Sequence, residues 1–242
     1  MKREYHKWFS TSLRKNMELL IFGHGGVSVL FFPTRMARFY DYENWKVIEA
    51  LRPRIEAGEL QVYCVDSIDQ ESFYNLNIPP RERIRRHIQY EGYIVNEVIP
   101  FIDEINTGSS VISAGCSMGA YHAVNLAFKH PQLFCKVVGM SGRYDVSQPI
   151  KMFRDLLDGY HNEDIYFNMP NQYISNLYDE ALINQIRKLD IIIAVGEEDA
   201  FLDDNRYLSS ELSKKGINNS LYIWNEEAHR PKYWRHMVQL YF

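Results

Sequence analysis

The chain has 242 residues, of which 46% are hydrophobic and 24% charged, and its formal net charge is -4 at pH 7. This length and apolar content suit one α/β domain with a full core, spanning residues 1–242, and they exclude a largely disordered chain. The weak negative charge excludes an electrostatic footprint for nucleic acid, and Glu82 interrupts the basic cluster at 81–86, which we expect to be a solvated helix face.

The cysteines and the N-terminus bear on localisation. Cys64, Cys116 and Cys135 have no metal-type spacing and are odd in number, which is typical of a reduced intracellular protein. The N-terminus lacks the apolar core of a secretory signal, and no apolar run reaches transmembrane length. We therefore expect a cytoplasmic protein with neither a nucleic-acid nor a membrane partner.

Along the chain, the first apolar runs are Glu18–Phe22 and Val27–Phe32, separated by Gly23-His24-Gly25-Gly26. This pattern predicts a β-hairpin, with Pro33 ending its second strand. The periodicity that follows predicts a helix at 44–55, closed by Gly58, and a buried strand at 60–65.

Strand and helix patterns then alternate. Helices are predicted at 81–105 (broken near Pro100), 121–129, 202–214 and 232–241, and strands at 111–114, 137–140, 191–195 and 220–224. This order predicts a three-layer α/β/α fold: a mostly parallel sheet, covered by helices on both faces, with the antiparallel N-terminal hairpin at one edge. The segment 143–178 interrupts the alternation and is either a lid or binding loop, or packed surface decoration.

The most informative motif is Gly115-Cys-Ser117-Met-Gly119, which follows a β-branched run and leads directly into a helix. A serine on such a tight strand-to-helix turn projects its hydroxyl above the sheet edge, as a nucleophile requires. The alternative is a glycine-rich turn with a serine helix cap. The strand, the small neighbours and the helix favour Ser117 as a nucleophile.

The nucleophile, acid, histidine order of α/β-hydrolases leaves His229 and His236 as candidate bases. His229 is favoured because it lies in a loop, whereas His236 falls within a helix. For the acid, the loop after strand 191–195 offers Asp199, with Asp203 as the next choice. The other acids of this loop, Glu197, Glu198 and Asp204, leave open that the loop is merely solvated.

An oxyanion hole needs two backbone donors, and the N–H of Met118, the residue after the serine, is the first. His24-Gly25-Gly26 resembles a lipase oxyanion motif, but the strand that follows it favours a turn. The loop Pro33–Met36 leaves a buried strand, and we therefore expect the Arg35 N–H, or that of a neighbour, to be the second donor. The Arg35 side chain is expected to meet either an anionic substrate group or a surface carboxylate.

With these residues identified, nearly the whole chain resembles the "putative esterase" family of α/β-hydrolases, which includes esterase D, feruloyl and acetyl-xylan esterases and mycobacterial mycolyltransferases. It is most similar to small cytoplasmic bacterial members of unassigned substrate. The matching segments are Pro33-Thr-Arg35, Val65-Asp-Ser-Ile-Asp69, Ser72-Phe-Tyr74, the Ser117 motif, His130-Pro-Gln-Leu-Phe134, Met140-Ser-Gly142, Gly196-Glu-Glu-Asp199 and His229. The chain departs from the family at His229-Arg230-Pro231 and at Arg35-Met36-Ala37-Arg38, beside the expected pocket mouth.

Residues and resemblance together predict a serine carboxylic-ester hydrolase with the triad Ser117, His229 and Asp199. It would act on a small-molecule ester without a metal or organic cofactor. Acyl transfer to an acceptor other than water, or a non-catalytic binding protein on the same fold, are the alternatives. A surface rich in Tyr and Phe would suit a homodimer.

Overall fold

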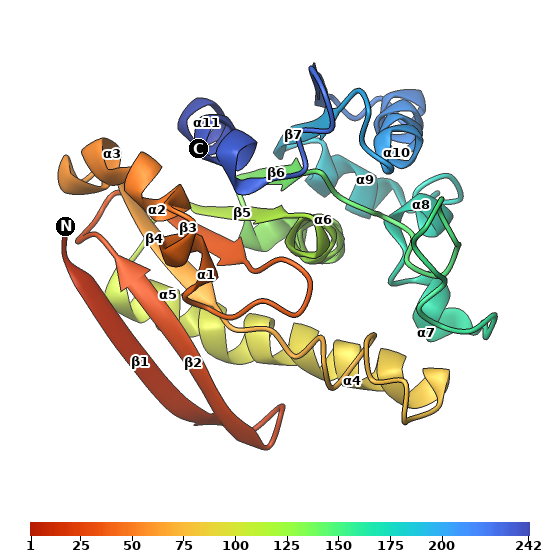
Figure 1. Ribbon diagram of the computed structural model, residues 1–242, viewed down its shortest axis with the longest axis horizontal. Coiled ribbons are helices and arrows are strands. Elements are labelled where there is room, and N and C mark those ends of the chain that lie inside the picture. Colours follow the sequence, from red (N-terminus) through yellow and green to blue (C-terminus); the bar gives the residue numbers. More distant parts are fainter.

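Eight strands form one sheet through the centre of the molecule (Figure 1) in the computed structural model, which describes residues 1–242. The strands are β1 (Arg3–Ser10), β2 (Lys15–Phe22), β3 (Val27–Phe32), β4 (Leu60–Val65), β5 (Val111–Cys116), β6 (Lys136–Met140), β7 (Asp190–Gly196) and β8 (Ser220–Trp224). Their order is β1-β2-β4-β3-β5-β6-β7-β8, and every pair from β4 to β8 is parallel. The predicted α/β fold class is confirmed.

Helices cover both faces of the sheet. They are α1 (Asp41–Asn44), α2 (Val47–Ala50), α3 (Arg52–Glu56), α4 (Pro80–Tyr93), the π-helix η1 (Ile94–Val98), α5 (Ile99–Ile105), α6 (Met118–Lys129), the 3₁₀ turn η2 (Pro131–Leu133), α7 (Glu163–Tyr166), α8 (Pro170–Tyr173), α9 (Glu180–Ile186), α10 (Leu202–Lys214) and α11 (Pro231–Tyr241). Successive residues of a strand point to opposite faces, so Leu30 and Phe32 of β3 join the core under α4, α6 and α10, while Val29 and Phe31 join the core under α1–α3 and α11. None of these helices combines the length and apolarity needed to cross a bilayer.

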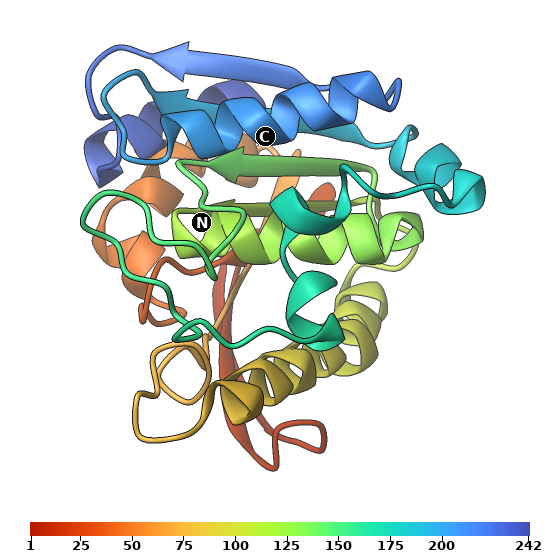
Figure 2. The same ribbon diagram turned by 90° about the vertical axis from the view of Figure 1, so that its right-hand side faces the viewer.

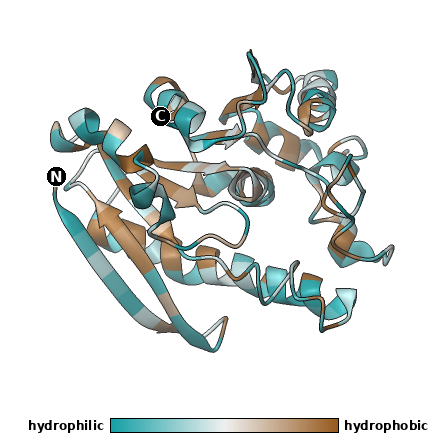
Figure 3. Cartoon of the chain, viewed as in Figure 1, coloured by the Kyte–Doolittle hydropathy of each residue, from teal (hydrophilic) through white to brown (hydrophobic).

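The prediction that Glu18–Phe22 and Val27–Phe32 pair as a hairpin is wrong, because these two strands are not neighbours in the sheet. β4 lies between β2 and β3, and the antiparallel edge hairpin is instead β1–β2, paired from Arg3 opposite Phe22 to Ser10 opposite Lys15. The Gly23–Gly26 link is a crossover: a Cβ at Gly26 would lie 2.3 Å from the Glu59 backbone, so glycine is needed for the close approach rather than for a two-residue turn. β1 gave no hydropathy signal because only its last residue is buried, and Figure 3 shows it largely hydrophilic beside a hydrophobic β2.

Two predicted helices differ in their continuity. The helix expected at 44–55 is three short pieces, broken where Lys46 adopts a φ of 62°. The helix expected to break near Pro100 instead runs from α4 through η1 into α5. Proline has no N–H for the carbonyl four residues earlier, and the wider π turn immediately before it accommodates that gap.

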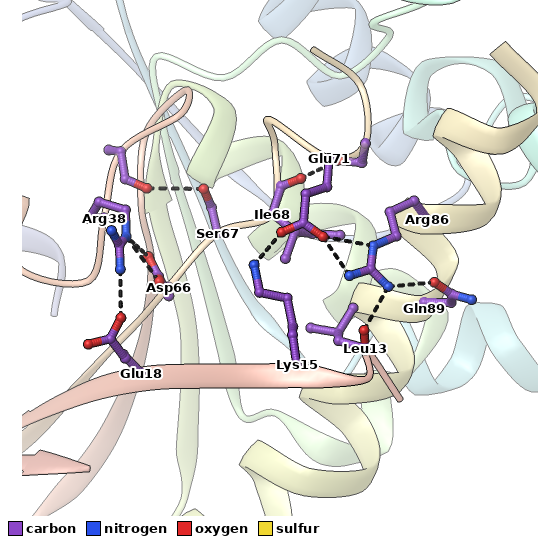
Figure 4. Close-up of polar contacts among 12 residues, drawn as sticks. Leu13, Lys15, Glu18, Arg38, Asp66, Ser67, Ile68, Glu71, Arg86 and Gln89 are labelled. Carbon is purple, nitrogen blue, oxygen red and sulfur yellow. Dashed lines mark hydrogen bonds and ion pairs between the residues drawn. The ribbon is translucent and has the colours of Figure 1, made fainter. Parts of the chain in front are cut away.

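Ion pairs attach the β1–β2 hairpin to the body of the protein (Figure 4). Glu71 pairs with Lys15 of β2 and with Arg86 of α4, and Arg86 also donates to the Leu13 carbonyl in the hairpin turn, at 3.0 Å. Nearer the sheet, Arg38 bridges Glu18 of β2 and Asp66 after β4, at 2.7 and 2.8 Å. The loops that follow β3 and β4 are therefore held together beside the hairpin.

The segment 143–178 leaves the sheet after β6 and runs along the same side as α6 (Figure 2). Val146, Leu156, Leu157, Ile165 and Met169 of this segment are buried in a small separate core with residues of α4 and α6. Whether the segment is a lid stays a prediction, but its apolar residues place it firmly against the domain.

Candidate active site

Ser117 occupies the sharp turn between β5 and α6, with φ 55° and ψ -120°. This conformation is unfavourable for a residue with a side chain. The turn is possible because its glycines touch backbone: a Cβ at Gly115 would lie 2.1 Å from the Gly119 oxygen, and one at Gly119 would lie 2.2 Å from the Phe32 oxygen. The Ser117 amide donates to the Met140 carbonyl at 2.8 Å, which fixes the turn against β6.

His229 and Asp199 come together from neighbouring loops. Asp199 follows β7 and His229 follows β8, and the His229 Nδ1 lies 2.9 Å from the Asp199 Oδ2. Asp199 is 2% exposed, and its other oxygen accepts the Phe201 amide at 3.0 Å. A buried carboxylate with one oxygen held by the backbone orients the imidazole through the other, which leaves Nε2 as the ring's free nitrogen.

The competing candidates lie elsewhere. The Asp203 side chain is 97% exposed and has only a 3.7 Å contact with Arg206. Asp204 is turned toward the Tyr144 amide, and His236 is exposed on α11. Of the acids and histidines considered from the sequence, the structure brings together Asp199 and His229.

Ser117 and His229 line one cavity of about 280 Å³, together with Thr34, Arg35, Tyr74, Met118, Arg143, Val146, Phe153, Phe201 and Trp234. The loops that carry these residues follow different parallel strands, whose carboxyl ends meet at one edge of the sheet. Ligands bind at this edge in open α/β sheets.

The two expected oxyanion donors also border this cavity. The backbone N–H groups of Met118 and Arg35 make no hydrogen bond within the protein. Both amides are therefore free to bind a further acceptor, and an oxyanion hole requires such free donors. His24 precedes β3 and so lies at the opposite edge of the sheet, away from Ser117.

A buried pair supports the Arg35 loop, and sequence reasoning did not identify it. Thr34 to Ala37 form a tight turn, closed by the Ala37 amide on the Thr34 carbonyl, in which Met36 adopts a φ of 54°. Asp69 Oδ2 accepts the Met36 amide at 2.9 Å, and its Oδ1 lies 3.1 Å from the Nε2 of His122. Asp69 is 1% exposed, so this carboxylate holds a strained turn from inside the protein.

The comparison with known families decides what this chain is. The sequence model of the family described as "Esterase: Putative esterase" matches residues 41–235. The chain belongs to this esterase family. It is therefore an enzyme that hydrolyses carboxylic esters.

Solved structures share the fold of this esterase at low sequence identity. A ferulic acid esterase superposes with a TM-score of 0.78 at 17% identity, covering 99% of this chain and 95% of the other. An S-formylglutathione hydrolase from Agrobacterium tumefaciens gives 0.74 at 15%, covering 98% and 93%. The fluorophosphonate-binding serine hydrolase F of Staphylococcus aureus gives 0.73 at 16%, covering 99% and 96%. No curated protein matches the chain in sequence.

Several cavity residues of the esterase were not expected from the sequence. Arg143, Val146 and Phe153 come from the irregular segment after β6, and Tyr74 comes from the loop after β4. Arg143 follows Ser141-Gly142 at the exit of a predicted strand, and this position was the one available signal. Phe153 carries no motif, and the match of Ser72-Phe-Tyr74 to the family did not place Tyr74 in the cavity; only the folded chain brings both rings beside Ser117.

Proposed function

We propose that the esterase hydrolyses a small-molecule carboxylic ester through an acyl-enzyme on Ser117, with His229 as general base and Asp199 as its orienting acid. The observation that carries the proposal is the 2.9 Å contact between His229 and Asp199 at a cavity that Ser117 also lines. The strained turn at Ser117 and the unpaired amides of Met118 and Arg35 support it independently.

In the first half of the reaction, the His229 Nε2 accepts the Ser117 hydroxyl proton as Oγ attacks the ester carbonyl. The Met118 and Arg35 amides donate to the oxygen that becomes negative, and Asp199 stabilises the imidazolium. His229 then gives its proton to the departing alcohol, which leaves an acyl group on Ser117. In the second half, His229 activates a water that attacks this ester and regenerates the serine.

We extend the proposal to the setting of the enzyme. Residues 1–242 form one domain in which 143–178 acts as a lid over the cavity, supported by the three residues that this segment contributes to the cavity wall. The enzyme acts in the cytoplasm on a small-molecule ester, with neither a membrane nor a nucleic-acid partner. Exposed Tyr5 and Phe9 on the edge strand β1 would suit a homodimer.

The test is Ser117→Ala, assayed with p-nitrophenyl acetate and with a fluorophosphonate probe. We expect the wild type to be labelled and active, and the variant to lose both labelling and at least about 10³-fold in kcat. Circular dichroism and Tm establish that the variant is folded. Ester hydrolysis that survives in folded Ser117→Ala would refute the triad, and a wild-type serine inert to the probe would favour a binding protein.

A further inference from the structure

The cavity beside Ser117 is lined by positively charged side chains and by no carboxylate. Of its eleven lining residues, Arg35 and Arg143 are cationic, and none is an aspartate or a glutamate. The remaining wall is mostly apolar or aromatic.

Arg143 is buried without a carboxylate partner. It is 6% exposed, and its Nε and Nη2 donate only to the backbone carbonyls of Asp145, Val146, Gln148 and Arg154. Its Nη1 has no hydrogen-bond partner in the protein, although the side chain lines the cavity. Removing a charge from water is costly unless an opposite charge compensates it, so this guanidinium can still receive an anion.

The carboxylates near Arg143 are already engaged. Asp145, Asp155 and Asp204 act on its charge from a distance, and each accepts two or more hydrogen bonds from other amides or hydroxyls. Burial lowers the pKa of Arg143 in spite of these carboxylates. Burial likewise raises the pKa of Asp204 to about 7, which reduces its negative charge at neutral pH.

Arg35 supplies a second free charge at the cavity mouth. Its side chain is exposed and forms no ion pair, and its guanidinium lies 6.0 Å from the centre of the Tyr74 ring. Burial raises the pKa of Tyr74 to about 12, while the charges of Arg35 and Arg143 both act to lower it. Both arginines therefore act on one tyrosine hydroxyl of the cavity wall.

We infer that Arg143 and Arg35 bind an anionic group of the substrate, and that this substrate is a small ester carrying a carboxylate close to its scissile bond. The inference rests on the proposed function of the same site. Guanidinium groups bind carboxylates through charge-assisted hydrogen bonds, here from the free Nη1 of Arg143 and from Arg35, and the low-dielectric wall strengthens them. The cavity of about 280 Å³ accommodates a small ester.

Matched pairs of esters test this inference in the wild-type enzyme. p-Nitrophenyl hydrogen adipate carries the charge on the acyl side and is compared with the neutral p-nitrophenyl adipamate. 4-Acetoxybenzoate carries it on the alcohol side and is compared with 4-acetoxybenzamide. We expect kcat/KM for the anionic member of at least one pair to exceed that for its neutral partner about tenfold or more, the usual effect of a charge-assisted hydrogen bond.

Arginine variants then locate the selectivity. Arg35→Gln and Arg143→Gln are each expected to lower the anionic-to-neutral ratio by about fivefold or more. Arg206→Gln is the matched control, because it removes an exposed arginine of α10 outside the cavity and should leave the ratio unchanged. Arg143 also holds its own loop, so Arg143→Gln could fail to fold. In that case Arg35→Gln, which changes an exposed side chain, tests whether an arginine causes the preference for the anionic ester.

Binding to the Ser117→Ala protein separates this inference from the triad. Calorimetry with each ester pair should give a Kd about tenfold or more lower for the anionic member, even if the wild type hydrolyses none of the esters. The inference is overturned if the neutral esters bind and react as well as the anionic ones. It is also overturned if every arginine variant that folds keeps the wild-type anionic-to-neutral ratio of kcat/KM. Activity that survives Ser117→Ala would instead refute the triad and leave the charge preference standing.

Discussion

Asp69→Ala tests whether the buried Asp69–His122 pair positions the oxyanion hole. The carboxylate accepts two hydrogen bonds, from the Met36 amide at 2.9 Å and from His122 at 3.1 Å. An alanine side chain has no acceptor, so the Met36 amide loses its partner whichever tautomer His122 adopts. This leaves the amide unsatisfied, at about 1–3 kcal/mol.

The magnitude of the kinetic effect follows from the strain at Met36. A φ of 54° is unfavourable by about 1–2 kcal/mol for a residue with a side chain, and the Asp69 hydrogen bond offsets this. Without it, the turn relaxes and moves the Arg35 amide away from the developing oxyanion. Loss of one oxyanion donor lowers kcat about 10²–10³-fold, and we expect a decrease at the lower end of this range.

The assay is kcat and KM for p-nitrophenyl acetate, together with Tm. A positioning role predicts a lower kcat with KM changed less than about threefold, because the oxyanion forms only in the transition state. Met36→Gly added to Asp69→Ala should recover part of kcat, since glycine adopts positive φ without strain. A lower Tm with wild-type kcat would refute the reasoning and leave Asp69 a purely structural role.

Three further predictions concern single contacts. Asp199→Asn should lower kcat about 10²–10⁴-fold by favouring the wrong imidazole tautomer, whereas the exposed Asp203→Asn should change kcat less than about threefold. Burial would raise the pKa of Glu91, but hydrogen bonds from a histidine and a lysine outweigh it and lower the pKa to about 2. A carboxyl group with a lowered pKa stabilises the folded protein above its unfolded pKa of 4.5, and this stabilisation is lost as the pH falls toward 2. Glu91→Gln should therefore lower the free energy of unfolding by about 1–3 kcal/mol at pH 7, measured by urea unfolding. The variant should also lose less stability than the wild type on acidification. Gly119→Ala should unfold or strongly destabilise the protein, measured by Tm, because its Cβ would lie 2.2 Å from a backbone oxygen, while Gly25→Ala, with open space around it, should be tolerated.

Opposite outcomes have distinct meanings in these three cases. If Asp199→Asn and Asp203→Asn lower kcat equally, Asp199 is not the acid that orients His229. An unchanged acid transition in Glu91→Gln would mean that its ion pairs contribute nothing to the fold. A stable Gly119→Ala would show that the turn at Ser117 can open away from β3.

Local patterns were sufficient for much of the fold. Apolar runs bounded by glycine, proline and polar residues predicted the strands Leu60–Val65 and Ser220–Trp224 at the residues where they occur. The strand–glycine–serine–glycine–helix pattern predicted the turn at Ser117 because one of its steric requirements, the close approach of Gly115 to Gly119, lies within five consecutive residues. These features depend on neighbours in the chain, and neighbours can be read from a sequence.

Tertiary structure decided what depends on contacts between distant residues. The strand between β2 and β3 is β4, which joins the sheet only after three short helices, so the glycine-rich link could be mistaken for a hairpin. Asp199 was one of several acids in its loop until the fold brought it to 2.9 Å from His229. The buried charge of Arg143 beside Ser117 and the support that Asp69 gives to Met36 likewise arise across the carboxyl edge of the sheet, where loops far apart in sequence meet. Hydropathy and spacing describe the chain along its length, whereas these contacts depend on which strands become neighbours.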